Sequence, residues 1–152
     1  MSPGKVSSRI ATQRLEWIET MLREIETLPL DDLDSFLGDR RNLWAAESCL
    51  RRALEALLDL GRHVLAKGFG RGVTEYKEIA TVLGELGVLE EAETRSLRVL
   101  AGYRNRMVHF YHEISEEELY EICSTRIADI RVLADALKGW MKRQPEIMDS
   151  SL

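Results

Sequence analysis

Cysteine, proline and long apolar runs are all scarce in this 152-residue sequence. Its two cysteines, Cys49 and Cys123, lie inside apolar helical patterns and lack the spacing of metal ligands, so we expect buried thiols in a reducing compartment. No apolar run approaches the roughly 20 residues that cross a bilayer. The first residues have no apolar stretch after their charges, as a secretory signal would have. We therefore expect a cytoplasmic protein without a membrane segment.

The charge balance is acidic overall but uneven along the chain. A net charge of −5 argues against a protein that coats nucleic acid non-specifically. Residues 40–71, however, hold seven basic and only three acidic side chains. Two interpretations remain open for this segment. It forms a local basic surface that attracts phosphate, or a solvated helix face that balances the acidic ends, and charge alone favours the second.

Strand patterns are also lacking, because apolar residues recur at helical spacing almost throughout. The sequence therefore predicts an all-α fold, an antiparallel bundle of about five helices. We expect one domain over residues 1–152, with its core at about 8–143. The longest helix is predicted at about 41–66, and its apolar stripe is unusually wide. Such a helix is either packed on more than one side or shared with a second subunit.

Two predicted helices meet near residue 109. One runs from about residue 90, and the last begins after Ser115, where Ser115 and Glu118 have the spacing of a capping box. We expect that last helix to continue to about Met141. The capping box requires a break in the chain before it.

The segment across this break, residues 104–111, reads Arg-Asn-Arg-Met-Val-His-Phe-Tyr. Residues five apart on a helix differ in direction by about 140°, so Arg104 and His109 face one site only if the helix ends near Val108. In extended chain beyond that point, His109 and Tyr111 share a side. The three polar side chains can then meet at one cleft.

The chemistry of such a cleft suits phosphate. A guanidinium binds phosphate bidentately, and an imidazole can take a proton from a ribose 2′-hydroxyl or protonate a leaving oxygen. Together they suffice for cleavage of RNA without a metal ion. His112 and Glu113 lack partners at ligand spacing, so we expect no metal site. The alternative is structural: Arg and His near a helix C-terminus also act as capping groups.

The motif Arg104-Asn105-x3-His109 resembles the Arg–polar–x3–His motif of the HEPN superfamily, and its extension to Tyr111 resembles the HepT-type branch. The segment Leu54-Glu-Ala-Leu-Leu-Asp-Leu-Gly-Arg-His-Val64 is similar to the second helix of that branch. The order of helices agrees as well, so the resemblance covers nearly the whole domain. It implies a HEPN-like bundle that forms a homodimer, with two motifs facing each other across a shared cleft.

The resemblance also implies a function. HepT-type proteins are ribonuclease toxins of two-gene toxin–antitoxin modules, so the expected substrate is RNA, such as tRNA or mRNA. By this resemblance Arg104 and His109 are catalytic and Asn105 orients them. Tyr111 is the residue that a minimal nucleotidyltransferase antitoxin adenylylates. Because the protein is acidic, we expect RNA contact only along the cleft, where Arg106 and the basic long helix contribute. No cofactor is implied.

Two other interpretations remain. The chain is a non-catalytic helical module of the same superfamily that binds a nucleotide or a partner protein, or it is a purely structural bundle. The presence of Arg104, Asn105, His109 and Tyr111 together favours the enzyme, because a module without catalysis need not keep all four.

Overall fold

The computed structural model describes residues 4–109 and 114–150, and over these the fold is all-helical, as predicted. The described residues form seven α-helices rather than about five, with one 3-10 turn and two very short strands. The elements are β1 (Val6–Ser7), α1 (Ser8–Glu26), α2 (Leu33–Leu37), α3 (Arg40–Phe69), α4 (Tyr76–Glu85), α5 (Glu91–Val108), α6 (Glu116–Thr125), α7 (Ile127–Lys142), η1 (Pro145–Ile147) and β2 (Met148–Asp149).

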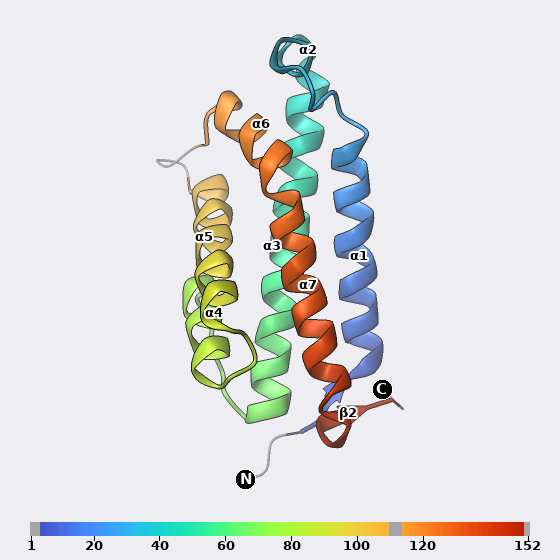
Figure 1. The fold of residues 1–152 in the computed structure, drawn as a ribbon, viewed down its shortest axis with the longest axis vertical. Coiled ribbons are helices and arrows are strands. Elements are labelled where there is room, and N and C mark those ends of the chain that lie inside the picture. The colour runs from blue at the N-terminus through green and yellow to red at the C-terminus, as the bar shows by residue number, and fades with distance from the viewer. Residues whose placement is uncertain (1–3, 110–113, 151–152) are drawn as a thin grey trace.

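Helix α3 is the central element of the bundle. Its 30 residues extend over about 45 Å at the rise of an α-helix, and all the other α-helices contact it. Figure 1 shows α1 and α7 along one side and the α4–α5 pair along the other. The wide apolar stripe is covered within the chain, since Leu50, Leu57 and Leu65 are fully buried. The first interpretation, a helix packed on more than one side, is therefore confirmed, and no second subunit is needed to cover these leucines.

Helix α4 packs against α3 at a glycine, Gly61. A Cβ atom on Gly61 would lie 3.0 Å from Leu83 Cδ1 and 3.1 Å from Ile79 Cγ2, both on α4. These distances are tighter than ordinary van der Waals contact, so the bare backbone of Gly61 sets the spacing of the two helices. The close approach brings the first turn of α4 against the polar side of α3.

The expectation that no strand is present is wrong at the two ends of the chain. β1 and β2 form a parallel pair of two residues each, too short to produce an alternating pattern in the sequence. The Ser7 N–H donates to Nε2 of His63 on α3 at 3.1 Å. Burial, with Lys67 and Arg14 nearby, lowers the pKa of His63, which favours the neutral imidazole that can accept this bond.

The predicted last helix is divided in two at Arg126, which separates α6 from α7. The reason is that the two halves of its apolar stripe face different neighbours. α6 turns toward α2, where the Tyr120 hydroxyl donates to the Leu30 carbonyl at 2.7 Å and its ring lies 5.3 Å from Phe36. α7 instead runs along α1, α3 and α5.

The cysteine prediction is confirmed for Cys123, which is buried, while Cys49 is partly exposed. Burial raises the pKa of the Cys123 thiol to about 12 and also raises that of Cys49. Neither thiol is activated as a nucleophile. Among the helices of residues 4–109 and 114–150, none combines the length and apolar character that a bilayer crossing requires.

Candidate active site

Helix α5 ends at Val108, as the spacing of Arg104 and His109 requires. His109 has extended backbone angles (φ −89°, ψ 123°), and its N–H donates to the Asn105 carbonyl at 3.0 Å. The helix therefore stops before His109. A helical backbone at His109 would direct its side chain away from Arg104, and the extended backbone does not. The expected break is confirmed.

A pocket of about 380 Å³ opens beside this helix end. Arg104, Asn105 and His109 line it together, so three of the predicted site residues are brought to one place. The opposite wall comes from the start of α4 and the preceding loop, and from Arg62 of α3. Tyr111 belongs to residues 110–113, which lie outside the part of the chain that the structure describes.

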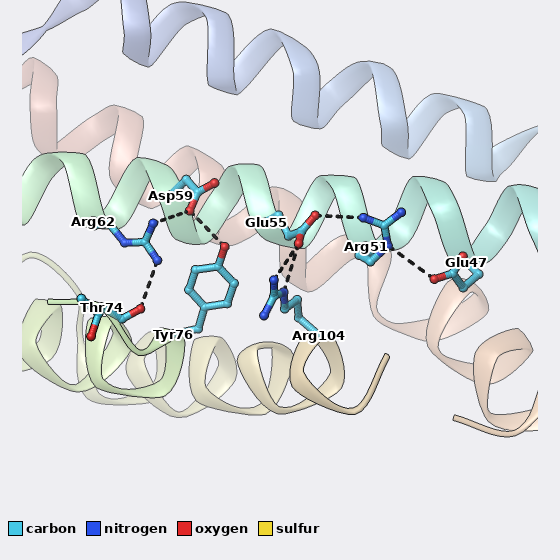
Figure 2. A network of polar contacts seen from close by, with 8 residues as sticks. All are labelled: Glu47, Arg51, Glu55, Asp59, Arg62, Thr74, Tyr76 and Arg104. Carbon is cyan, nitrogen blue, oxygen red and sulfur yellow. Dashed lines mark hydrogen bonds and ion pairs between the residues drawn. The ribbon is translucent and has the colours of Figure 1, made fainter. Parts of the chain in front are cut away.

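The Arg104 side chain is held from two directions (Figure 2). Its Nε and Nη2 atoms donate to Oε2 of Glu55 on α3, at 3.2 and 2.8 Å. Its guanidinium carbon lies 4.5 Å from the centre of the Tyr76 ring, within the range of a cation–π contact. Glu55 occupies the Nε side of the guanidinium, which leaves the Nη1 group for another acceptor such as a phosphate oxygen.

A second ion pair lies one helical turn along α3. Asp59 Oδ1 accepts from the Tyr76 hydroxyl at 3.0 Å and from Arg62 at 3.2 Å, and Arg62 also donates to the Thr74 carbonyl at 3.1 Å (Figure 2). Burial and the Asp59 carboxylate raise the pKa of the Tyr76 hydroxyl. Tyr76 therefore stays protonated and fixes α4 to α3, with its ring beside Arg104.

Arg106, predicted as a supporting residue, does not line this pocket. Its guanidinium pairs with both carboxylate oxygens of Glu118 on α6. The capping box at Ser115 is therefore only half formed. Ser115 Oγ accepts from the Glu118 N–H at 3.1 Å, while the Glu118 carboxylate is turned to Arg106. Arg106 thus connects the end of α5 to the first turn of α6.

Sequence reasoning missed the role of four residues around Arg104. Tyr76 was not singled out from the sequence, and Glu55, Asp59 and Arg62 were predicted only as members of the long helix. A signal was present, since Glu55 and Asp59 are four residues apart and each follows a leucine of the buried stripe. Charged residues at that spacing beside a buried face indicate partners on another helix.

No cluster of three or more His, Cys, Asp or Glu side chains that could hold a metal ion occurs within residues 4–109 and 114–150. Two cations of the basic segment 40–71 pair with carboxylates on their own helix, namely Arg51 with Glu47 and Glu55, and Arg62 with Asp59. Of its seven cations, Arg62 is the one that reaches the pocket lining within the described residues.

Comparisons with known proteins agree on one family. The sequence profile of the family described as "Ribonuclease HepT-like" matches residues 18–137. The chain is 27% identical over 112 residues to a tRNA nuclease HepT of Aphanizomenon flos-aquae (strain 2012/KM1/D3), which covers 73% of this chain and 76% of that protein.

Two solved structures share the fold at low sequence identity. A tri-AMPylated HEPN toxin of Shewanella oneidensis, in complex with an MNT antitoxin, superposes with a TM-score of 0.77 at 19% identity, over 86% of this chain and 97% of that chain. YutE of Bacillus subtilis, a cytosolic protein of unknown function, superposes with a TM-score of 0.75 at 19% identity, over 92% and 94% of the two chains.

Proposed function

The chain belongs to the Ribonuclease HepT-like family, and from this premise we propose that it is a metal-independent endoribonuclease and the toxin of a toxin–antitoxin pair. The observation that carries the proposal is the convergence of Arg104, Asn105 and His109 on one pocket. The similarity to a protein named tRNA nuclease HepT supports RNA as the substrate, with tRNA as the first RNA to test.

In the proposed reaction, His109 takes the proton of a ribose 2′-hydroxyl. The 2′-oxygen then attacks the adjacent phosphorus, the bond from phosphorus to the 5′-oxygen breaks, and a proton returns to that oxygen. Arg104 binds the non-bridging oxygens as negative charge develops on them. Glu55 and Tyr76 hold the guanidinium in place, so little reorganisation is needed when RNA binds.

This reaction predicts cleavage in the absence of divalent metal. The purified chain should cut RNA in EDTA and leave 2′,3′-cyclic phosphate or 3′-phosphate ends together with 5′-hydroxyl ends, because the nucleophile belongs to the substrate. The ends are identified by enzymatic labelling and mass spectrometry. Activity that EDTA abolishes and magnesium restores would contradict metal independence. RNA binding without any cleavage would favour the non-catalytic module instead.

A nucleotidyltransferase antitoxin that adenylylates Tyr111 is the proposed means of control. The AMPylated state of the Shewanella toxin, bound to its MNT antitoxin, supports this proposal. Tyr111 is two residues from His109 in sequence, so an AMP group on its hydroxyl would bring negative charge close to the site where the RNA phosphate must bind. Repulsion and loss of space would then exclude the substrate.

The substitution Tyr111→Phe tests this control. The variant should keep much of its RNA cleavage yet escape neutralisation by a co-expressed cognate nucleotidyltransferase, because it lacks the hydroxyl that is modified. Intact mass of the co-expressed wild-type chain should show one or more AMP additions, with one mapping to Tyr111 by peptide sequencing. An unmodified wild-type chain together with a fully neutralised Phe variant would show that the antitoxin acts by binding alone.

A homodimer is the proposed assembly. Its support is the family resemblance, since the apolar stripe of α3 is covered within one chain. Light scattering on a size-exclusion column should give twice the 17.4 kDa mass of the chain, and a stable 17.4 kDa species at micromolar concentration would contradict it.

A further inference from the structure

The candidate pocket is positively charged on a protein that is negatively charged overall. Three cationic side chains line it, namely Arg62, Lys77 and Arg104, against one carboxylate, Glu75. The chain as a whole has a net charge of −5. One arginine is enough to bind the phosphate that is cleaved, so the other two cations are not explained by the proposed reaction.

The carboxylates that pair with the two arginines are not part of the pocket lining. Glu55 and Asp59 project from α3 and bind Arg104 and Arg62, but neither carboxylate lines the pocket. Figure 2 shows both carboxylates on the α3 side of the two guanidinium groups. The ion pairs fix the positions of the cations, and the side chains that line the pocket are three cations and one carboxylate.

The two guanidinium groups are held at a set separation by Tyr76. Their central carbons lie 5.2 Å (Arg62) and 4.5 Å (Arg104) from the centre of its ring, so the carbons are at most about 10 Å apart. Figure 2 shows the ring between the two groups. With the ring between them, the two groups can each contact a different phosphate of a single strand.

The start of α4 adds to the same wall. Lys77 lies in its first turn with an exposed side chain, next to Tyr76. The N-cap residue, Glu75, makes no side-chain hydrogen bond to the helix end. The backbone N–H groups of this helix end lie beside Lys77, and two carboxylates, Glu75 and Glu78, lie at the same end.

We propose that this pocket binds two successive RNA phosphates: Arg104 and His109 take the phosphate that is cleaved, and Arg62 and Lys77 take its neighbour in the strand. The minimum ligand is therefore an oligonucleotide with two adjacent phosphodiesters. This inference rests on the proposed function only for the assignment of the cleaved phosphate to Arg104. The second phosphate subsite is a matter of binding and is tested without any cleavage.

The test is a displacement assay with non-cleavable oligonucleotides. A fluorescent RNA is bound to His109→Ala protein and displaced by 2′-O-methyl oligonucleotides with one, two or three phosphodiesters. Affinity should rise at least about tenfold from one phosphodiester to two, the size of one charge-assisted hydrogen bond, and much less from two to three. Over the same step, the number of counterions released on binding, obtained from the slope of log affinity against log salt concentration, should increase by about one.

Three variants, each made in the His109→Ala protein, locate the second subsite. Lys77→Ala and Arg62→Ala should reduce the gain from the second phosphodiester, and the double variant should abolish it. Arg62→Ala removes the ion pair with Asp59 and could unfold the protein. Lys77 is exposed, so Lys77→Ala should fold and tests the subsite in that case. Arg95→Ala is the matched control, because Arg95 is an exposed α5 arginine paired with Glu91 and outside the pocket lining.

The proposal is overturned if the double variant keeps the wild-type gain, or if Arg95→Ala loses it equally. Failure of the proposed function is a separate result. If the wild-type chain cleaves no RNA but shows the gain in affinity from one phosphodiester to two, the proposed phosphate subsite stands and the proposed nuclease function fails. If the chain cleaves RNA without that gain, the proposed nuclease function stands and the proposed subsite fails.

Discussion

Replacing His109 by alanine should lower the rate of RNA cleavage by about 10²-fold or more, the usual effect of removing a general base. The side chain is exposed at the end of α5, so the fold should not depend on it. Cleavage of labelled RNA under single-turnover conditions measures the loss. Expression of the wild type should arrest growth and expression of the variant should not, while the helical circular dichroism signal is the same in both. Wild-type cleavage by this variant would remove His109 from the reaction.

Arg104 should show a loss of the same size, for an electrostatic reason. Arg104→Lys keeps the charge but loses the planar set of donors that can bind Glu55 and a phosphate oxygen at once, so it should recover only a small part of the rate that Arg104→Ala loses. Arg95→Ala is again the matched control and should cleave as the wild type does, since Arg95 lies outside the pocket lining. Full activity in Arg104→Lys would show that only a point charge is needed.

Leu57→Asp should prevent folding. Leu57 is fully buried at the centre of α3, and a carboxylate there would have to stay charged without a partner or take up a proton at a cost in stability. That cost is several kcal/mol against a total stability of about 5–15 kcal/mol for a domain of ordinary size. Circular dichroism should show loss of the helical signal or a large drop in the melting temperature.

The control for Leu57→Asp is Val132→Asp. Val132 lies on α7 with 56% of its surface exposed, so the same change should alter stability by no more than about 0.5 kcal/mol. A Leu57→Asp protein that folds as a stable monomer would show that the α3 stripe tolerates water, contrary to the packing in the structure.

The elements of the fold were predictable where a local signal existed. The α3 stripe and the end of α5 near Val108 follow from helical spacing and from the capping residues that require a break after α5. The break at Arg126 was not predictable, because the apolar pattern continues through it and only the positions of α2 and α1 require the chain to bend. Tertiary neighbours decided that boundary.

The site residues were likewise predictable only where the signal is local in sequence. Arg104 and His109 were found from their spacing, which is local in sequence. Their supports were not found, because the Arg104–Glu55 pair joins residues 49 positions apart and the Tyr76–Asp59 bond joins residues 17 apart. One sequence contains no information on which distant carboxylate faces which guanidinium. Helix packing supplies that information, and here the close approach at Gly61 is part of it.

The pairing of Arg104 with Glu55 also has a consequence for the timing of synthesis. Glu55 leaves the site of synthesis 49 residues before Arg104, which at about 5–20 residues per second is an interval on the order of several seconds. During that interval α3 carries Glu55 without Arg104, and the chain lacks both the Arg104 guanidinium and the His109 imidazole. A nascent chain therefore cannot cleave RNA until α5 is complete and packed on α3. While the first two-thirds of the chain are being translated, the proposed ribonuclease activity therefore cannot act on the ribosome that makes the protein.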